Sequence, residues 1–237
     1  MIRRTLLLAS LLVLAASPLR AAQAQEVTFH TDDGVPIVGS LYLPSRPGPG
    51  IILLHALSRT HEDWQPVATR LADAGFVALA IDLRGHGASG PLPEGASLED
   101  LTRMVADVKA ARAFLATRRE VVPNRIGIAG ASIGANLAIL FAAGDPAVRS
   151  LALLSPGIDY RGLRPEAAMK KYGDRPALLV ASQEDNYSAN STRQLAGSGP
   201  GVRDLRILTG AGHGTAMLGR QPDLVGTIVD WFRRTLL

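Results

Sequence analysis

The chain of 237 residues contains no cysteine. Disulfide bonds, thiolate metal sites and a cysteine nucleophile are therefore excluded. Lysine and arginine form no stripe interleaved with aromatic residues, so the sequence gives no support for nucleic-acid binding. It also contains no internal repeat and no low-complexity segment. Any chemistry that this chain performs must therefore use side chains other than thiols.

Long apolar runs are also scarce. Residues 6–16 are apolar apart from Ser10, and they are too few to span a bilayer, which takes roughly 20 residues. Arg3 and Arg4 precede this run, and Ala22-Gln23-Ala24 follows it as an A-x-A cleavage site. We therefore predict a cleaved signal peptide over residues 1–24, exported by the general secretory route rather than the twin-arginine route. The mature protein is expected to be periplasmic or secreted and free of the membrane; an uncleaved N-terminal anchor is the alternative.

The predicted leader also accounts for most of the positive charge. Arg3, Arg4 and Arg20 lie in it, so the net charge falls from +4 for the whole chain to about +1 for residues 25–237. The high isoelectric point of the whole chain therefore says little about partners. Hydrophobic residues make up 47% of the chain, which suits one globular domain with a full core. We predict a single α/β domain over residues 25–237.

Strand and helix patterns alternate along this domain. The predicted strands cover residues 26–31, 36–43, 51–54, 77–81, 125–129, 148–154, 177–181 and 205–208. The predicted helices cover residues 62–74, 98–117 and 135–143, and a closing helix starts at Asp223. All-apolar strands alternating with helices indicate a parallel sheet that is covered on both faces. Ligands of such a sheet bind at the carboxyl ends of the strands.

The most informative motif is Gly130-Ala131-Ser132-Ile133-Gly134. It fits Gly-x-Ser-x-Gly and lies between a predicted strand and a predicted helix, where the pattern places a serine on a sharp, exposed turn. Glycine is needed on both sides because a Cβ would collide with neighbouring backbone in so tight a bend. Ser132 is therefore the predicted nucleophile.

A serine nucleophile needs a base and an acid. His213 lies between glycines just after the last predicted strand, and the order Ser…Asp…His is one of the known orders of a catalytic triad. Asp185, which follows the strand 177–181, is the predicted acid. Asp159, which follows the preceding strand, is the alternative, whereas Glu184 is expected to point elsewhere from the same turn as Asp185.

An oxyanion hole needs two preorganised N–H donors. We predict the backbone N–H of Ile133, directly after the nucleophile, and that of Leu57, in the loop after the strand 51–54; Ala56 is the alternative to Leu57. His55, in the same loop, is interpreted as a brace for that loop rather than a second base. The string Asp82 to Ser89 is interpreted as a glycine-rich turn and not as a metal site, because no second histidine lies at ligand spacing.

Taken together, these motifs resemble the α/β-hydrolase superfamily, in particular its small serine esterases and dienelactone-hydrolase-like members. The resemblance rests on His55-Ala56-Leu57, Asp82 to Ser89, Gly130 to Gly134, Asp185 and His213, in the family's order across the mature chain. It implies an eight-stranded, mostly parallel sheet whose second strand is antiparallel. The chain departs from the family in having His-Ala where His-Gly is common. It also has serine where dienelactone hydrolases proper use cysteine, which disfavours their substrate.

The resemblance implies a carboxylesterase-like hydrolase that acts on a small-molecule ester through an acyl-enzyme, without metal or organic cofactor. The short segment between the strands ending at Leu154 and starting at Ala177 leaves room only for a minimal lid. Residues 87–95 and 160–172 are then the expected walls of an open site. A peptidase or an acyltransferase with the same triad is the alternative, and a binding protein that keeps the fold without catalysis is a further one.

Overall fold

The computed structural model describes residues 23–90 and 96–237. Their centre is one eight-stranded sheet in the order β1-β2-β4-β3-β5-β6-β7-β8. Strand β2 (Pro36–Tyr42) runs antiparallel to both of its neighbours, and all other adjacent pairs are parallel. The predicted eight-stranded, mostly parallel sheet with an antiparallel second strand is therefore confirmed.

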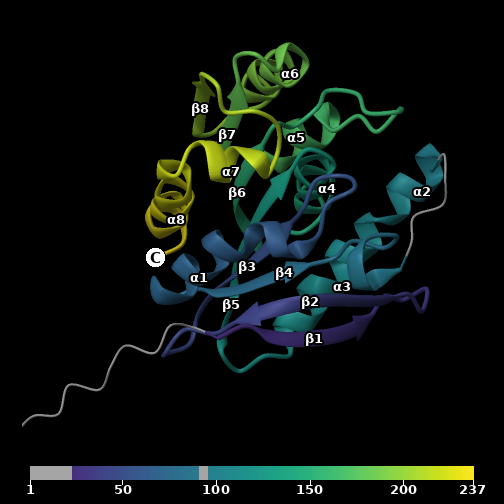
Figure 1. Cartoon of the computed structure of the whole chain (residues 1–237), viewed down its shortest axis with the longest axis vertical. Helices are drawn as coiled ribbons and strands as arrows, with labels where there is room; N and C mark the ends of the chain where they lie inside the picture. Colours follow the sequence, from purple (N-terminus) through teal and green to yellow (C-terminus); the bar gives the residue numbers. More distant parts are fainter. Residues whose placement is uncertain (1–22, 91–95) are drawn as a thin grey trace, which may run out of the picture.

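Helices cover both faces of this sheet (Figure 1). The remaining strands are β1 (Gln25–His30), β3 (Gly48–Leu54), β4 (Val77–Ile81), β5 (Val121–Ala131), β6 (Val148–Leu154), β7 (Ala177–Ser182) and β8 (Arg203–Leu208). The α-helices are α1 (Gln65–Asp73), α2 (Leu98–Arg103), α3 (Val105–Ala116), α4 (Ile133–Ala142), α5 (Glu166–Tyr172), α6 (Asn186–Ala196), α7 (Ala216–Arg220) and α8 (Asp223–Leu236). Two short 3₁₀ helices are η1 (His61–Trp64) and η2 (Gly87–Ser89).

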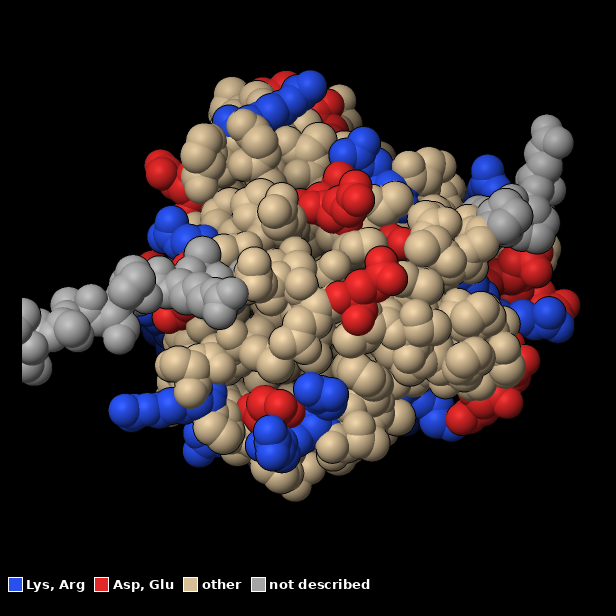
Figure 2. All heavy atoms as spheres, turned by 60° about the horizontal axis from the view of Figure 1, so that its bottom comes forward, with Lys and Arg blue, Asp and Glu red and all other residues tan. Residues whose placement is uncertain are grey.

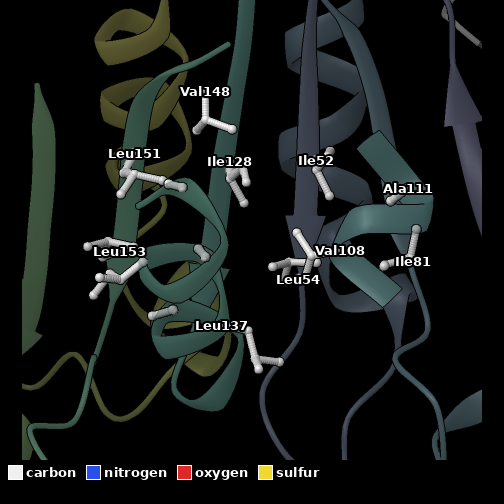
Figure 3. Close-up of a cluster of buried hydrophobic side chains, with 14 of the residues drawn as sticks. Ile52, Leu54, Ile81, Val108, Ala111, Ile128, Leu137, Val148, Leu151 and Leu153 are labelled. Carbon is white, nitrogen blue, oxygen red and sulfur yellow. The ribbon is translucent and has the colours of Figure 1, made fainter. Parts of the chain in front are cut away.

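The core consists of two apolar layers, one on each face of the sheet. Successive side chains of a strand point to opposite faces, so Ile52 and Leu54 of β3 pack with α3 and α4, whereas Ile51 and Leu53 pack with α1 and α8. Figure 3 shows part of the first layer, with Leu137 of α4 among the side chains drawn. Every residue of β3, β4 and β7 is buried. This burial explains why these strands read as continuous apolar runs instead of alternating ones.

The surface carries charges of both signs. In the face of Figure 2, blue side chains lie mostly around the edge, several of them beside red ones, and further red side chains lie among uncharged residues near the centre. Several are neighbours on one helix, such as Arg103 with Glu99 and Lys170 with Glu166. Exposed pairs of this kind contribute less than about 1 kcal/mol each, so the fold depends on the two apolar layers.

Two predicted helices differ from the observed ones. The segment 98–117 is not one helix: α2 and α3 meet at Met104, where N–H groups bond three residues back instead of four. That tighter hydrogen bonding is the 3₁₀ pattern, and it interrupts the α-helical ladder. The predicted helix 62–74 begins instead as η1, and α1 starts at Gln65, because Pro66 lacks an N–H and suits only the first turn of an α-helix.

Helices α5, α6 and α7 were not predicted. They are short or rich in serine and asparagine, residues that compete for backbone hydrogen bonds and weaken a helical pattern. The segment between β6 and β7 holds one small turn, bridged between Tyr160 and Leu163, and α5. This part of the chain thus places no large lid over the carboxyl ends of the strands.

The predicted leader, residues 1–24, lies almost wholly outside the described residues, and so does the second half of the predicted wall 87–95. Among the residues that the structure does describe, no helix is both long and apolar enough to cross a membrane.

Candidate active site

Ser132 occupies a strained turn between β5 and α4. Its backbone angles, φ 53° and ψ −116°, lie where non-glycine residues are rare, at a cost of about 1–3 kcal/mol. A Cβ added at Gly130 would lie 2.3 Å from the carbonyl oxygen of Gly134, and one added at Gly134 would lie 2.5 Å from that of Leu54. Both flanking glycines are therefore required by the close approach of backbone, as the motif predicted.

The start of α4 offers an N–H group directly beside this serine. Ile133 is the first residue of the helix, and its N–H has no hydrogen-bond acceptor within the described part of the chain. The Ser132 carbonyl already accepts from the N–H groups of Ala135 and Asn136, at 3.0 and 3.2 Å. The unused N–H and the positive end of the helix dipole both favour negative charge at this point.

His213 lies in the loop after β8 and contacts Asp185, which lies just after β7. Its Nδ1 is 2.5 Å from Asp185 Oδ2, and Ser188 Oγ is 3.4 Å away. Asp185 is also the N-cap of α6, because its Oδ1 accepts from the Ser188 N–H at 3.2 Å. Burial raises the pKa of Asp185, but the hydrogen bonds from His213 and Ser188 outweigh it and hold that pKa below its ordinary value. Asp185 is therefore ionised at neutral pH and faces the imidazole.

The histidine loop, residues 209–215, packs against the serine turn. A Cβ added at Gly214 would lie 3.7 Å from Ala131 Cβ and 3.9 Å from Ser132 Cβ. Within the described residues there is no hydrogen bond between Ser132 and His213. Catalytic hydrogen bonds often shorten only when substrate is bound, so the structure brings the predicted nucleophile and base to adjacent loops without closing the bond between them.

Three side chains hold this loop in place, and two of them, Ser155 and Ser182, were not singled out by the sequence. They bind its backbone: Gly210 N–H donates to Glu184 Oε2 at 2.9 Å, Ala211 N–H to Ser182 Oγ at 3.0 Å and Gly214 N–H to Ser155 Oγ at 3.0 Å. Ser182 ends β7 and Ser155 directly follows β6. A polar residue at the carboxyl end of an apolar strand is the signal that could have indicated them. Glu184, as predicted, points away from His213.

Asp159, the alternative acid, has other partners. Its carboxylate accepts from Arg164 Nε at 2.6 Å and from the Gly162 N–H at 2.8 Å. The Arg164 hydrogen bond and ion pair hold the pKa of Asp159 below its ordinary value. Its backbone N–H donates to Tyr187 Oη at 3.0 Å. The structure thus brings Asp185, and not Asp159, to His213.

The loop after β3 carries the second predicted oxyanion donor. Leu57 has no hydrogen-bond partner for its N–H within the described chain, and Ser58 beside it has φ 59°. His55 is fully buried: its Nδ1 donates to Ala56 O at 2.7 Å, and its Nε2 accepts from Leu83 N–H at 3.0 Å. Burial lowers the pKa of His55 to about 4, so the ring is neutral. These contacts agree with the interpretation of His55 as a brace.

The glycine-rich turn that begins at Asp82 is held by ion pairs. Asp82 Oδ1 accepts from the His61 backbone N–H at 2.7 Å and lies 2.9 Å from His61 Nδ1. Arg84 donates to Asp107 at 2.7 Å and to Asp33 at 2.7 Å, which links the turn to α3 and to the β1–β2 hairpin. No group of three or more metal-ligating side chains gathers anywhere in residues 23–90 and 96–237. The turn is structural in its contacts.

Comparison with known proteins identifies the family and the fold of the chain. A family model described as "Serine aminopeptidase, S33" matches residues 46–194. A putative phosphoribosyl transferase of Mycobacterium tuberculosis is 28% identical over 222 residues, which cover 92% of this chain and 47% of that protein. The chain thus spans about half the length of this curated relative.

Solved structures share the fold. The esterase Pf2001 of Pyrococcus furiosus superposes with a TM-score of 0.75 at 18% identity, covering 91% of this chain and 94% of that one. The dienelactone hydrolase of Anabaena variabilis gives 0.72 at 19% identity, covering 92% of this chain and all of that one. Identity at this level establishes the shared fold but not a shared substrate.

Proposed function

The chain belongs to the serine aminopeptidase S33 family of the α/β-hydrolase superfamily, and we propose that it is a serine hydrolase that cleaves carboxylic esters. The observation that carries this proposal is the contact between His213 and Asp185, 2.5 Å long, made by a loop that packs against the strained Ser132 turn. Nucleophile, base and orienting acid are the three roles that acyl transfer by serine requires.

The proposed reaction has two halves. His213 removes the proton from Ser132 Oγ while that oxygen attacks the ester carbonyl carbon, and then gives the proton to the departing alcohol. The acyl group stays on Ser132. Water, deprotonated by His213, then attacks the acyl carbon, and the carboxylic acid leaves as the proton returns to Ser132. Asp185 keeps the imidazole oriented and stabilises its charged form throughout.

The carbonyl oxygen becomes negatively charged in both tetrahedral intermediates, and hydrogen-bond donors must stabilise that charge. We assign this role to the N–H groups of Ile133 and Leu57, with Ala56 as the neighbour of Leu57 in the same loop. Both N–H groups lack a partner in the described chain, and the first lies at a helix N-terminus. A preorganised donor of this kind contributes roughly 100- to 1,000-fold to kcat.

The proposed substrate class is exogenous small-molecule esters. The short segment between β6 and β7 carries only the Tyr160–Leu163 turn and α5, which leaves the carboxyl ends of the strands thinly covered. A thin cover favours small or extended esters over a substrate that needs a deep lipid tunnel. We also propose, from the N-terminal pattern of the sequence, that the reaction takes place outside the cytoplasm.

The description of the matching family favours a second candidate, an aminopeptidase with the same triad. An amide is harder to cleave than an aryl ester because its nitrogen is a poorer leaving group. Paired substrates with one acyl group, as the p-nitrophenyl ester and the p-nitroanilide, separate the two proposals. We expect turnover of the ester and little of the anilide; efficient turnover of an aminoacyl anilide would favour the peptidase.

A fluorophosphonate probe tests the shared mechanism. We expect it to label the wild-type protein and not Ser132→Ala, with the adduct on the peptide that contains Ser132. Removing the hydroxyl leaves the strained backbone in place, so the variant is expected to fold. Circular dichroism checks this. If wild-type protein stays unlabelled while a control serine hydrolase is labelled, the chain is not a serine hydrolase, and a binding role becomes the better explanation.

A further inference from the structure

Asp63 connects two loops of the candidate site that are far apart in the sequence. It lies in η1, just after the loop that carries Leu57. Arg59, at the end of that loop, donates to both of its carboxylate oxygens, from Nε at 2.7 Å and from Nη2 at 2.6 Å. This bidentate geometry orders the end of the loop, because two parallel hydrogen bonds fix the carboxylate plane.

The other partner of Asp63 comes from the histidine loop. Thr215, two residues after His213, donates its hydroxyl to Asp63 Oδ2, across 152 positions of sequence. Thr215 is 5% exposed, and the Asp63 side chain is 16% exposed. The hydroxyl bond is therefore partly shielded from water, which makes it stronger than a fully exposed bond and costly to leave unpaired.

Close packing at Gly214 also brings the same two loops together. A Cβ added at Gly214, between His213 and Thr215, would lie 3.3 Å from Ala56 Cβ, next to Leu57. The positive φ of Gly214, 58°, allows this approach. The loop with the proposed oxyanion donor thus touches the loop with the proposed base, and a carboxylate joins them on one side.

We propose that Asp63, held by Arg59 and bound by Thr215, is a positioning residue that sets the distance between the Leu57 N–H and His213. The role rests on the proposed serine-hydrolase function. Base and oxyanion donor act on the same tetrahedral carbon, one at the attacking or leaving oxygen and the other at the carbonyl oxygen. Their separation must therefore match one substrate geometry, and a displacement of about 1 Å can cost up to roughly 100-fold in rate.

Thr215→Val, which keeps the shape and removes the hydroxyl, is the central test. We expect kcat on a p-nitrophenyl ester to fall about 10-fold with KM changed by less than about twofold, since ground-state binding is not affected. Thr215→Ser restores the hydroxyl and is expected to recover most of kcat. Because Asp63→Asn weakens the same bridge, the double variant should lose no more than the larger single loss.

Thr235→Val is the matched control. Thr235 also makes a partly buried hydroxyl bond across the sequence, to Ser150 Oγ at 2.8 Å, but near the amino ends of the strands. We expect its kcat to equal that of the wild type. If Thr215→Val keeps wild-type kcat, or if both threonine variants lose kcat equally, Asp63 has no positioning role.

Hydrogen–deuterium exchange tests the bridge without relying on activity. In Thr215→Val, amides of residues 56–60 should exchange at least about threefold faster, although the substitution lies over 150 positions away. Thr235→Val should leave them unchanged. Unchanged exchange in Thr215→Val would overturn the bridge. If the wild type neither turns over esters nor binds the fluorophosphonate, the proposed function fails, and exchange alone still decides whether Asp63 couples the two loops.

Discussion

At the carboxyl ends of the strands, serine and histidine side chains and free N–H groups gather in strained loops, whereas at the amino ends arginine side chains bind the backbone carbonyls. Three serines near the carboxyl ends have left-handed backbone angles: Ser58, Ser132 and Ser155, with φ of 59°, 53° and 50°. The Ser155 side chain has a structural partner, since its hydroxyl accepts a hydrogen bond from the Gly214 N–H and so holds the histidine loop. The strain is thus maintained by contacts around the site.

The amino ends are arranged for stability. Arg175 donates to four backbone carbonyls in the segments that lead into β6 and β7: Ala142 and Tyr172 at 2.9 Å, Asp145 at 2.9 Å and Val148 at 2.7 Å. Its guanidinium also lies 4.1 Å from the centre of the buried Tyr172 ring. Burial lowers the pKa of Arg175, but a guanidinium stays charged at neutral pH.

The volume of a cavity does not identify the candidate active site in this protein. A cavity of about 570 Å³ opens at the amino ends, and its lining includes Arg125, Arg149, Arg175 and Arg234. The residues that line it include no serine and no histidine, and Arg175 is already bound to backbone carbonyls. The candidate active site lies at the opposite ends of the strands, where hydrogen-bonding groups lack partners and backbone is strained. In this protein, the strained Ser132 turn and the contact between His213 and Asp185 mark the site better than volume does.

The largest expected effect distinguishes the two carboxylates near the site. Asp185→Asn should lower kcat about 10,000-fold, because an amide cannot stabilise the imidazolium or keep the required tautomer. Asp159→Asn should change kcat by less than about twofold, since its partner Arg164 is exposed. Steady-state kinetics on a short-chain aryl ester measures both. Equal losses, or a loss only in Asp159→Asn, would reverse the assignment of the acid.

Backbone crowding predicts the next effect. Gly134→Ala should destabilise the protein by about 3 kcal/mol, since its Cβ would lie 2.5 Å from Leu54 O and 2.6 Å from His55 O. Gly226→Ala, in α8 with nothing within 4 Å, is the control and should stabilise by up to about 1 kcal/mol. Urea unfolding measures both. A Gly134→Ala variant as stable as wild type would mean that the turn is not crowded.

The amino ends should respond in stability alone. Arg175→Ala removes one hydrogen-bond donor from each of four backbone carbonyls and should cost about 2 kcal/mol of unfolding free energy. Arg125→Ala, at an exposed position lining the same cavity, is the control and should cost less than about 0.5 kcal/mol. Both variants should keep the wild-type kcat per folded molecule. A large loss of kcat in Arg175→Ala would contradict this division between the two ends of the sheet.

The smallest expected effect depends on pH. The Asp82 carboxylate, 2.9 Å from His61 Nδ1, raises the pKa of His61 above its ordinary value of 6.5, despite the opposing effect of burial. A raised pKa in the folded state stabilises the protein below the unfolded value, and this stabilisation is lost as pH rises through the folded pKa. His61→Gln should therefore reduce the unfolding free energy at about pH 5.5, by less than about 1 kcal/mol, and less at about pH 8.5. Equal losses at both pH values would contradict the ion pair.

Much of the fold could be predicted because its signals are local. All-apolar runs indicated the buried strands, and the expected position of the antiparallel strand came with the family resemblance. The break at Met104 could not be predicted, since both halves of the segment 98–117 carry a helical pattern and only the hydrogen bonding changes there. Helix α6 was missed because its stability comes from packing and from the Asp185 cap, not from its serine-rich sequence.

The sequence by itself determined the Ser132 turn, because two flanking glycines and a strand-to-helix change act over five residues. It also indicated which loops would meet, since parallel strands end at one edge of the sheet. Tertiary structure alone decided that Asp185 rather than Asp159 faces His213, and that Ser155, Ser182 and Thr215 hold the histidine loop. These bonds join residues 28 to 152 positions apart, and which side chain reaches which partner depends on the path of each loop in space.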